Sequence, residues 1–437
     1  MSAIAPLPEA STQDGARRRP RVVVVGGGFA GMAAVRQLGA ADVDVLLIDK
    51  NGYTTFQPLL YQVATGGLNP GDVTYYLRAY TSRFKNADFL RARVTGVDTA
   101  NRQVQLDEGK PVDYDYLVVS CGVTANYFGI PGAAENSHLI YTRAGAIETR
   151  DLIFTAVEEA AQGRAGAPDP TIVVVGAGAT GVEMAGALAE LRNDAIPVAY
   201  RNLPKERVRI VLVEMADVVL APFDPGLRDY AAKELRERGV DLRLQTSVQE
   251  VRPDAVVVKD PDGSIETIST AATVWATGVS ASPVVGGWGL PTGRGGRIEV
   301  EPDLRVVGHP EIFAAGDVSI AGSSLPQLAQ PAIQGGKHAG IQIRRLLAGA
   351  PTEPFQYHDK GIMATIGFTD AVAQLPRGVK VKGVIAWLAW IGLHVITLIG
   401  NRNRFATMVN LSVRYFTWPR SLNIVVGDPA DIRADRG

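Results

Sequence analysis

The sequence predicts an α/β fold in which one strand–turn–helix unit occurs twice and a helical C-terminal region follows. The first unit begins at Arg21 in the stretch "RVVVVGGGFAG", and the second begins at Thr171 in "TIVVVGAGATG". Each joins β-branched residues to closely spaced glycines and then to an alanine-rich stretch, which is the order strand, tight turn, helix. The third observation is a basic tail without acidic residues between Ala371 and Gly427.

The first turn has the glycine spacing of a dinucleotide-binding loop. Gly26 and Gly28 let the backbone turn sharply and approach a pyrophosphate, and Gly31 lets the helix pack closely on the strand. Asp49 ends the next strand, "VDVLLID", where its carboxylate can accept hydrogen bonds from a ribose. The residues expected to bind this nucleotide are Gly26, Gly28, Phe29, Ala30, Gly31, Asp49 and Lys50.

The second turn repeats the pattern, with its acidic residue after a longer insert. One such turn is weak evidence for a nucleotide, whereas two with their acids are much stronger, although two purely structural glycine turns remain the alternative. Two sites favour a bound flavin and an exchangeable nicotinamide, because electrons must enter and leave by different routes. The fold class is therefore two Rossmann-like dinucleotide-binding domains. The residues expected on the second side are Gly176, Gly178, Gly181, Glu214 and Gly278.

Composition limits the function classes. The chain has 437 residues, 46% of them hydrophobic, and a net charge of −1, which fits a globular enzyme of two or three domains and suggests no nucleic-acid partner. Its single cysteine, Cys121, excludes an internal disulfide framework and the redox dithiol of a disulfide reductase. We expect Cys121 to be buried at a strand end. No metal site is visible.

The chain divides into an interrupted first domain, an inserted second domain and a tail. Residues 1–20 are rich in small, polar and proline residues, lack the apolar core of a signal peptide and are expected to be a disordered lead-in. The strand "EIFAAGDVS" is expected to return to the first domain. The predicted domains are 21–138 with 277–348 for flavin binding, 139–276 for NADH binding, and 349–437 for membrane anchoring and the quinone side.

Four further residues are candidates for the redox site. Asp317 follows Gly316 at a strand end, where it either hydrogen-bonds a flavin ribityl hydroxyl or caps a turn. A helix is predicted to begin near Gln330, with its positive N-terminal end able to stabilise a reduced flavin. Gln330 and Gln334 share one face of that helix and either flank the second substrate or are solvated.

Glu183 is expected in the first turn of the second nucleotide-binding helix. There it either interacts with the helix dipole alone or reaches the nicotinamide carboxamide.

The tail is unusual in charge and hydropathy. Between Ala371 and Gly427 there are seven basic residues, no acidic ones and six aromatic ones, around the uncharged stretch "GVIAWLAWIGLHVITLIG", Gly383 to Gly400. An in-plane interfacial anchor explains both the apolar stretch and its basic flanks and is favoured. A core or dimer contact and a true membrane span remain alternatives, since 18 residues are borderline for a span.

From Arg21 to about Val426 the chain resembles the type II NADH dehydrogenases, the single-subunit, non-proton-pumping NADH:quinone oxidoreductases, most closely their actinobacterial members. The motifs are "VGGGFAG", "FQPLLYQVATGGLNP", "NYFGIPG", "VVVGAGATGVEMAGALAE", "VWATGV", "IFAAGD", "AQPAIQ" and "MATIGF…AWLAWIGLHVITLIGNRNRF". One departure is Phe368, where many relatives carry a basic residue, which puts the local tail surface in doubt.

The resemblance implies FAD and NADH as cofactors, ubiquinone or menaquinone as acceptor, and a homodimer held on the cytoplasmic face of the membrane through anionic lipid. It places the first glycines, Asp49 and Asp317 on FAD, and the second glycines and Glu214 on NADH, with Glu183 near the nicotinamide. It places Ala329, Gln330, Pro331 and Gln334 on the quinone side. Rival functions are a soluble NADH-dependent reductase of a small iron–sulfur protein and a flavin-binding redox sensor.

Overall fold

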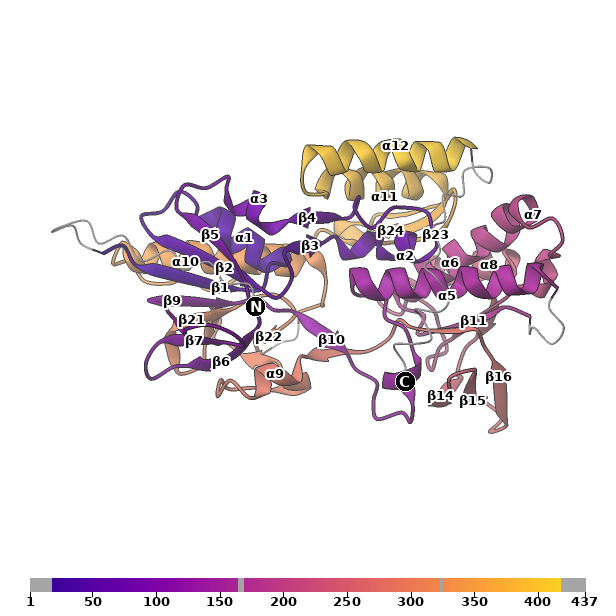
Figure 1. The fold of residues 1–437 in the computed structure, drawn as a ribbon, viewed down its shortest axis with the longest axis horizontal. Coiled ribbons are helices and arrows are strands. Elements are labelled where there is room, and N and C mark those ends of the chain that lie inside the picture. The colour runs from indigo at the N-terminus through magenta and orange to yellow at the C-terminus, as the bar shows by residue number, and fades with distance from the viewer. Residues whose placement is uncertain (1–17, 164–168, 323–324, 418–437) are drawn as a thin grey trace. The chain divides into compact units, whose positions relative to one another are not determined.

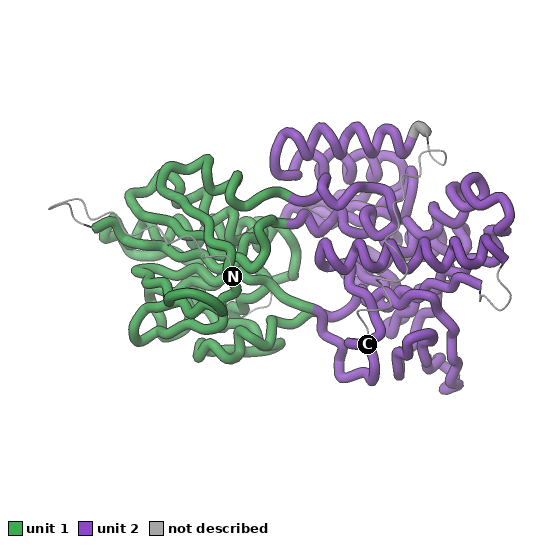
Figure 2. The backbone as a smooth tube through the Cα atoms, in the orientation of Figure 1, with its two compact units in different colours: residues 1–54, 75–124, 279–359 green, residues 55–74, 125–278, 360–437 purple. Residues whose placement is uncertain are grey.

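The computed structural model describes residues 18–163, 169–322 and 325–417, which form two compact units (Figures 1 and 2). Unit 1 comprises the residues up to Thr54, then Tyr75–Thr124 and Val279–Asp359. Unit 2 comprises Thr55–Thr74, Ala125–Gly278 and the residues from Lys360. Most of the predicted lead-in and the tail beyond 417 lie outside the described residues. Short strands lie near the unit boundaries: β3 (Tyr53–Thr55), β4 (Thr74–Tyr76) and β10 (Val123–Ala125).

Unit 1 is built on a six-stranded sheet in the order β20-β21-β9-β1-β2-β5. All its neighbouring strands pair in parallel except β20 with β21. Val22, Val23 and Val24 of β1 are fully buried, as the continuous β-branched run predicts for a central parallel strand. The strands are β1 (Arg21–Val25), β2 (Asp44–Asp49), β5 (Ala87–Arg91), β9 (Tyr116–Val119), β20 (Arg305–Val306) and β21 (His309–Ala314).

Two long helices of unit 1, α1 and α10, pack against each other. Their backbones approach closely, since a Cβ at Gly336 of α10 would lie 2.0 Å from the Ala30 carbonyl oxygen. The helices are α1 (Phe29–Leu38), α3 (Leu77–Thr81), α9 (Pro283–Gly286) and α10 (Ala329–Leu347). The remaining strands are β6 (Val94–Asp98), β7 (Gln103–Leu106), β8 (Val112–Asp113), β18 (Val279–Ala281), β19 (Ile298–Glu299) and β22 (Ser319–Ile320).

Unit 2 contains a four-stranded parallel sheet in the order β13-β12-β11-β17 and an antiparallel sheet in the order β14-β15-β16. Its strands are β11 (Thr171–Val175), β12 (Arg209–Val213), β13 (Asp241–Arg243), β14 (Ser247–Val251), β15 (Ala255–Lys259), β16 (Ile265–Ser269) and β17 (Ala272–Trp275). Its helices before the tail are α2 (Leu60–Ala64), α4 (Ala133–Asn136), α5 (Arg143–Ala161), α6 (Ala179–Glu190), α7 (Ile196–Ala199) and α8 (Pro225–Glu237).

The two units repeat one topology as well as one motif. The strand before each glycine turn, β1 or β11, is central, with the next strand and an edge strand on one side. On the other side lies a later strand, β9 or β17, and each is preceded along the chain by a three-stranded antiparallel sheet. The predicted fold class of two Rossmann-like domains is therefore confirmed.

The C-terminal part of unit 2 consists of a three-stranded antiparallel sheet and two helices. Its elements are β23 (Ile362–Gly367), β24 (Asp370–Gln374), β25 (Lys380–Lys382), α11 (Val384–Thr397) and α12 (Asn401–Thr417). Strand β23 lies beside α6, and α11 lies beside β24. Within the ranges that the structure describes, none of the helices has the length and apolarity needed to cross a bilayer.

Candidate functional site

The first glycine turn lies between β1 and α1. Gly26 has a left-handed backbone (φ +102°), and a Cβ there would lie 2.5 Å from the Ser120 carbonyl oxygen. At Gly31 a Cβ would lie 1.9 Å from the Gly26 carbonyl oxygen, so only glycine lets α1 begin this close to the strand. Gly28 differs, because a Cβ there would meet no protein atom within 4 Å. Gly28 therefore borders the open space that a pyrophosphate would approach.

The second turn, between β11 and α6, reproduces this geometry. Gly176 has φ +98°, and a Cβ at Gly181 would lie 1.8 Å from the Gly176 carbonyl oxygen. Gly178, like Gly28, has no protein atom within 4 Å of a Cβ position. Neither helix has a side-chain cap at its N-terminal residue. Backbone N–H groups at both helix starts are thus available to an anion.

The predicted ribose carboxylates also hold the turns together. Asp49 accepts hydrogen bonds from the Gly27 N–H and the Asn51 N–H, both at 2.7 Å. Glu214 accepts from the Ala177 N–H at 2.6 Å and from the Ala216 N–H at 2.8 Å. Burial raises the pKa of Asp49, against these two N–H groups. Because an ionised carboxylate has about four acceptor positions, each acid can fix its turn and still bind a hydroxyl.

Of the other residues predicted to bind the first nucleotide, Phe29 and Ala30 lie in α1, whereas Lys50 follows β2. Phe29 begins α1, and Ala30 is buried where α10 approaches. Lys50 is exposed, and its carbonyl oxygen accepts from the Arg91 side chain at 3.3 Å.

Cys121 is exposed, so the prediction that it is buried was wrong. It lies beyond Val119, the last residue of β9, beside the space around the glycine turn.

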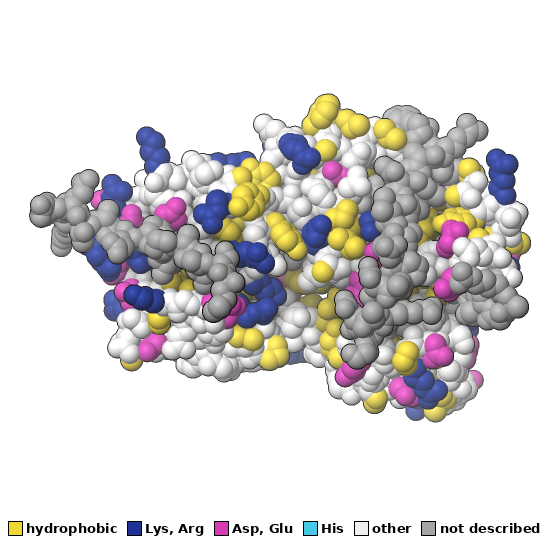
Figure 3. Space-filling model, in the orientation of Figure 1, with side chains coloured by type: hydrophobic (Ala, Val, Ile, Leu, Met, Phe, Trp, Pro, Cys, Tyr) yellow, Lys and Arg dark blue, Asp and Glu magenta, His cyan; other side chains and the backbone are white. Residues whose placement is uncertain are grey.

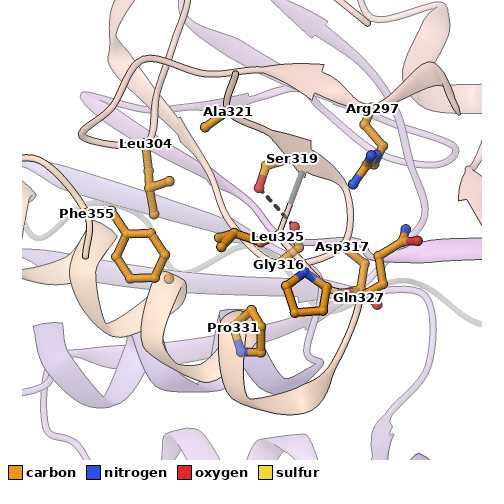
Figure 4. A pocket seen from close by; sticks show the side chains of 12 residues that line it. Arg297, Leu304, Gly316, Asp317, Ser319, Ala321, Leu325, Gln327, Pro331 and Phe355 are labelled. Atoms are coloured by element: carbon orange, nitrogen blue, oxygen red, sulfur yellow. Dashed lines mark hydrogen bonds between the residues drawn. The ribbon is translucent and has the colours of Figure 1, made fainter. Parts of the chain in front are cut away.

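Asp317 lies in a pocket of unit 1 that β22 and α10 help to form (Figure 4). Gly316 before it has φ +83°, and its carbonyl oxygen accepts from the Ser319 hydroxyl at 2.9 Å. Burial raises the pKa of Asp317 to about 6, and the buried cation Arg297 acts in the opposite direction. A half-buried carboxylate of this kind suits a hydroxyl donor such as a ribityl chain. The lining residues are Arg297, Leu304, Gly316, Asp317, Ser319, Ala321, Leu325, Pro326, Gln327, Pro331, Gly335 and Phe355.

Helix α10 begins at Ala329, as predicted to within one residue, with Pro331 in its first turn. Ala329 and Gln330 are both half-buried. Gln334 is already engaged, because its Nε2 donates to the His358 carbonyl oxygen and its Oε1 accepts from the His358 N–H, each at 3.0 Å. Gln334 therefore holds the segment around His358.

Glu183 lies one turn further into α6 than predicted. Since α6 begins at Ala179, Glu183 is its fifth residue, and its carboxyl is buried rather than placed at the helix end. Its Oε1 accepts from the Thr365 N–H of β23 at 3.4 Å. Burial raises the pKa of Glu183 to about 8, while the Thr365 N–H and the Trp390 side chain act to lower it. At neutral pH this carboxyl therefore holds a proton.

Gly278 has a structural reason to be glycine. Its φ is +63°, and a Cβ would lie 2.4 Å from the Phe128 ring. Its carbonyl oxygen accepts from the Asn126 N–H at 3.1 Å.

Sequence reasoning missed the buried polar residues around α2. Gln62, Glu190 and Arg414 are all buried, and Arg414 donates to both of the others. The sequence signals were the motif "FQPLLYQVATGGLNP", which contains Gln62, and the motif "VVVGAGATGVEMAGALAE", which ends in Glu190.

Comparison with known proteins shows the family to which this chain belongs. A family model described as "Pyridine nucleotide-disulphide oxidoreductase" matches residues 20–336. The type II NADH:quinone oxidoreductase Ndh of Mycobacterium tuberculosis is 38% identical over 420 residues, covering 92% of this chain and 89% of that protein. The chain belongs to the type II NADH:quinone oxidoreductases. The resemblance predicted from the motifs is thus confirmed.

One further relative and two solved structures share less sequence identity with this chain. The internal alternative NAD(P)H-ubiquinone oxidoreductase A1 of Arabidopsis thaliana mitochondria is 30% identical over 440 residues, covering 92% of this chain and 84% of that protein. NDH2 from Plasmodium falciparum, solved in complex with NADH, is 18% identical and superimposes with a TM-score of 0.85, covering 93% of this chain and 100% of that chain. The sulfide:quinone oxidoreductase of Aquifex aeolicus is 19% identical with a TM-score of 0.72, covering 91% and 95%. The two solved structures establish a shared fold.

Proposed function

We propose that this protein passes a hydride from NADH to bound FAD and then two electrons to a respiratory quinone, without pumping protons. The observation that carries the proposal is the duplicated glycine turn. Each unit has its own uncapped helix N-terminus and its own turn carboxylate, Asp49 or Glu214. Two such sites suit one resident and one exchanging nucleotide. The single cysteine leaves no redox dithiol to take the electrons instead.

FAD is held by the first turn, with Asp49 on the adenosine ribose and Asp317 on the ribityl chain. Bound FAD accepts a hydride and releases electrons in pairs or singly, which is chemistry that no side chain supplies. The chain's contribution is to position the group. Gly28 leaves room for the pyrophosphate, and the positive end of α10 at Ala329 would stabilise negative charge on a reduced flavin.

NADH binds at the second turn. Gly178 leaves room for its pyrophosphate, and Glu214 accepts from the adenosine ribose, which disfavours the extra phosphate of NADPH. Gly278 closes the turn after β17, and Glu183 lies near the nicotinamide, held by Thr365. A protonated Glu183 can donate a hydrogen bond to a carboxamide oxygen, which an ionised carboxylate cannot.

The quinone, ubiquinone or menaquinone, is received near the start of α10, where Ala329, Gln330 and Pro331 lie and Gln334 positions the neighbouring chain. The first domain is then 21–138 with 277–348, the second is 139–276, and 349–437 serves anchoring and the quinone side.

The protein binds the membrane surface through α11 and α12, on the cytoplasmic face, as a homodimer. Large apolar side chains on both helices are exposed, with Ile385 at 71% and Phe405 at 66%, and Figure 3 shows hydrophobic side chains gathered over α12. Basic residues of the tail favour anionic lipid. The other exposed apolar residues are Val384, Leu388, Leu393, Ile396, Met408, Val409 and Val413.

The deciding experiment is an anaerobic titration of detergent-purified protein. NADH should bleach the flavin absorbance, and a short-chain quinone should restore it. Bleaching that quinone reverses no faster than air would favour a redox sensor or a protein acceptor and refute the proposal. A Gln334→Ala variant should slow the quinone step more than the NADH step, because releasing His358 loosens only the α10 side. Equal slowing of both steps would contradict that role.

A further inference from the structure

Helix α12 presents a polar stripe to the body of unit 2. Its members recur at intervals of four, three and four residues, which places them on one helix face. Their bonds reach the segment 62–74, with 2.6 Å from Asn403 Nδ2 to the Thr74 carbonyl oxygen and 2.6 Å from Asn410 Nδ2 to Asp72 Oδ2. The four residues are Asn403, Thr407, Asn410 and Arg414.

The opposite side of α12 is apolar and exposed, at Phe405, Met408, Val409 and Val413. Unlike an ordinary surface helix, α12 therefore buries a stripe of polar groups, and its exposed side carries large apolar side chains beside polar ones such as Arg402, Arg404 and Ser412. Hydrogen bonds, which require defined geometry, fix its position on segment 62–74.

The last member of the stripe, Arg414, makes the most buried contact. Its Nη2 lies 2.8 Å from Glu190 Oε2, and its Nη1 donates to Gln62 Oε1. Arg414 and Glu190 are both nearly inaccessible to solvent. The approach depends on Gly67, because a Cβ there would lie 1.7 Å from Arg414 Nη1.

Gln62 continues the connection towards Glu183. Its Nε2 donates to the Tyr61 hydroxyl at 2.8 Å. The buried Tyr61 lies close enough to Glu183 for the two to interact electrostatically, and its ring packs edge-on against Trp390, with centroids 6.1 Å apart. Glu183 and Glu190 are seven residues apart on α6, about two turns, and so share one face of that helix.

We propose that Arg414 is a positioning residue for the reaction with NADH: it ties α12 to Gln62 and Glu190 and thereby fixes the Tyr61 hydroxyl beside Glu183. The inference rests on the proposed function, in which Glu183 lies at the nicotinamide. A guanidinium suits the task because its planar fork can bond two partners at once, which an ammonium group does less well.

Two substitutions break the connection from different sides. Arg414→Lys keeps a buried cation for Glu190 but loses the fork to Gln62. Gly67→Ala keeps the arginine at position 414 but displaces its guanidinium from Gln62, because the new Cβ would lie 1.7 Å from Arg414 Nη1. Gly71→Ala is the matched control, because a Cβ there meets no atom within 4 Å. Arg402→Met is the charge control, since Arg402 is exposed on the same helix.

The measurement is stopped-flow bleaching of full-length FAD-loaded protein by NADH. Both Arg414→Lys and Gly67→Ala should lower the limiting rate about tenfold, as expected for a loss of alignment near the reacting group. The apparent Kd for NADH, the flavin content and the binding to anionic liposomes should stay unchanged, because the glycine turns and the apolar faces are untouched. Both controls should match wild type in the limiting rate and in the apparent Kd for NADH.

A double-mutant cycle tests the connection itself. Tyr61→Phe should slow bleaching to a similar extent, and Arg414→Lys with Tyr61→Phe should be no slower than the worse single variant, because both act through one chain of contacts. Additive slowing, or normal limiting rates in Arg414→Lys and Gly67→Ala, would overturn this inference and leave the proposed function standing. Wild-type protein that NADH fails to bleach would refute the proposed function and the inference with it. Equal changes in NADH Kd and flavin content would indicate a general structural role and would also overturn it.

Discussion

Alanine in place of Gly181 should separate the NADH site from the FAD site. The new Cβ would lie 1.8 Å from the Gly176 carbonyl oxygen, whereas ordinary contact begins at 3.4 Å. The turn and α6 must therefore separate by roughly 1.6 Å. Overpacking of this kind costs about 1–3 kcal/mol, and a reacting group misplaced by about 1 Å loses on the order of 100-fold in rate.

Gly178→Ala provides the contrast within the same turn. Its Cβ meets no protein atom within 4 Å, so the fold should keep its stability. It does occupy the space assigned to the pyrophosphate, so NADH binding should weaken. We therefore expect both variants to raise the NADH concentration needed for half-maximal bleaching, and only Gly181→Ala to lower Tm, by a few degrees for a domain of this size.

The assay combines flavin content, thermal unfolding and NADH titration of flavin absorbance. Both variants should retain FAD, because the first turn lies in unit 1. Gly31→Ala, whose Cβ would lie 1.9 Å from the Gly26 carbonyl oxygen, should instead lose FAD. Release of FAD by Gly181→Ala with normal NADH binding would show that the two turns are assigned the wrong way round. Normal NADH binding by Gly178→Ala would refute the pyrophosphate's approach at that residue.

Three other predictions concern the side chains of Glu183, of Asp317 and of the exposed apolar residues of α12. The pKa of Glu183 is about 8 in the folded state and 4.5 ordinarily, so the stability of the wild-type protein should fall as pH rises from about 4.5 to 8. Glu183→Gln should therefore have a higher Tm than wild type at pH 8.5 and nearly the same Tm at pH 4.5. A Tm difference that stays constant across this range would contradict the burial argument. Asp317→Asn should weaken FAD retention at pH 8, and FAD retention by wild-type protein should decline as pH falls through about 6, where Asp317 gains a proton. Ultrafiltration of the released flavin measures both effects. Equal FAD retention by Asp317→Asn and wild type would show that Asp317 does not bind FAD. Phe405→Ser with Met408→Ser should shift protein from the pellet to the supernatant of an anionic-liposome sedimentation, whereas Ser412→Ala on the same helix should not; unchanged pelleting would argue against α12 as the anchor.

The sequence by itself determined the local units. A β-branched run followed by glycines at fixed spacing specifies strand, turn and helix over about a dozen residues, because the left-handed backbone of Gly26 and the contact of Gly31 with the Gly26 carbonyl oxygen arise within the turn itself. The strand-end position of Asp49 and the start of α10 at Ala329 are likewise local, and both were predicted correctly.

The surroundings of the individual side chains were decided only by the tertiary structure. Glu183 reads as a helix-end residue in sequence, but the Thr365 N–H that meets it is 182 residues away. Phe368, the departure from the family pattern, stacks on Tyr415 with ring centroids 5.0 Å apart and lies edge-on to Trp387 at 5.3 Å.

Helix α12 shows the physical reason most clearly. Periodicity assigns Asn403, Thr407, Asn410 and Arg414 to one face of the helix, but it does not say which face is buried. That choice depends on partners far along the chain, since Gln62 and Arg414 are separated by 352 residues. A burial pattern opposite to the usual one arises where distant polar groups satisfy one another inside the fold, and local sequence carries no record of those partners.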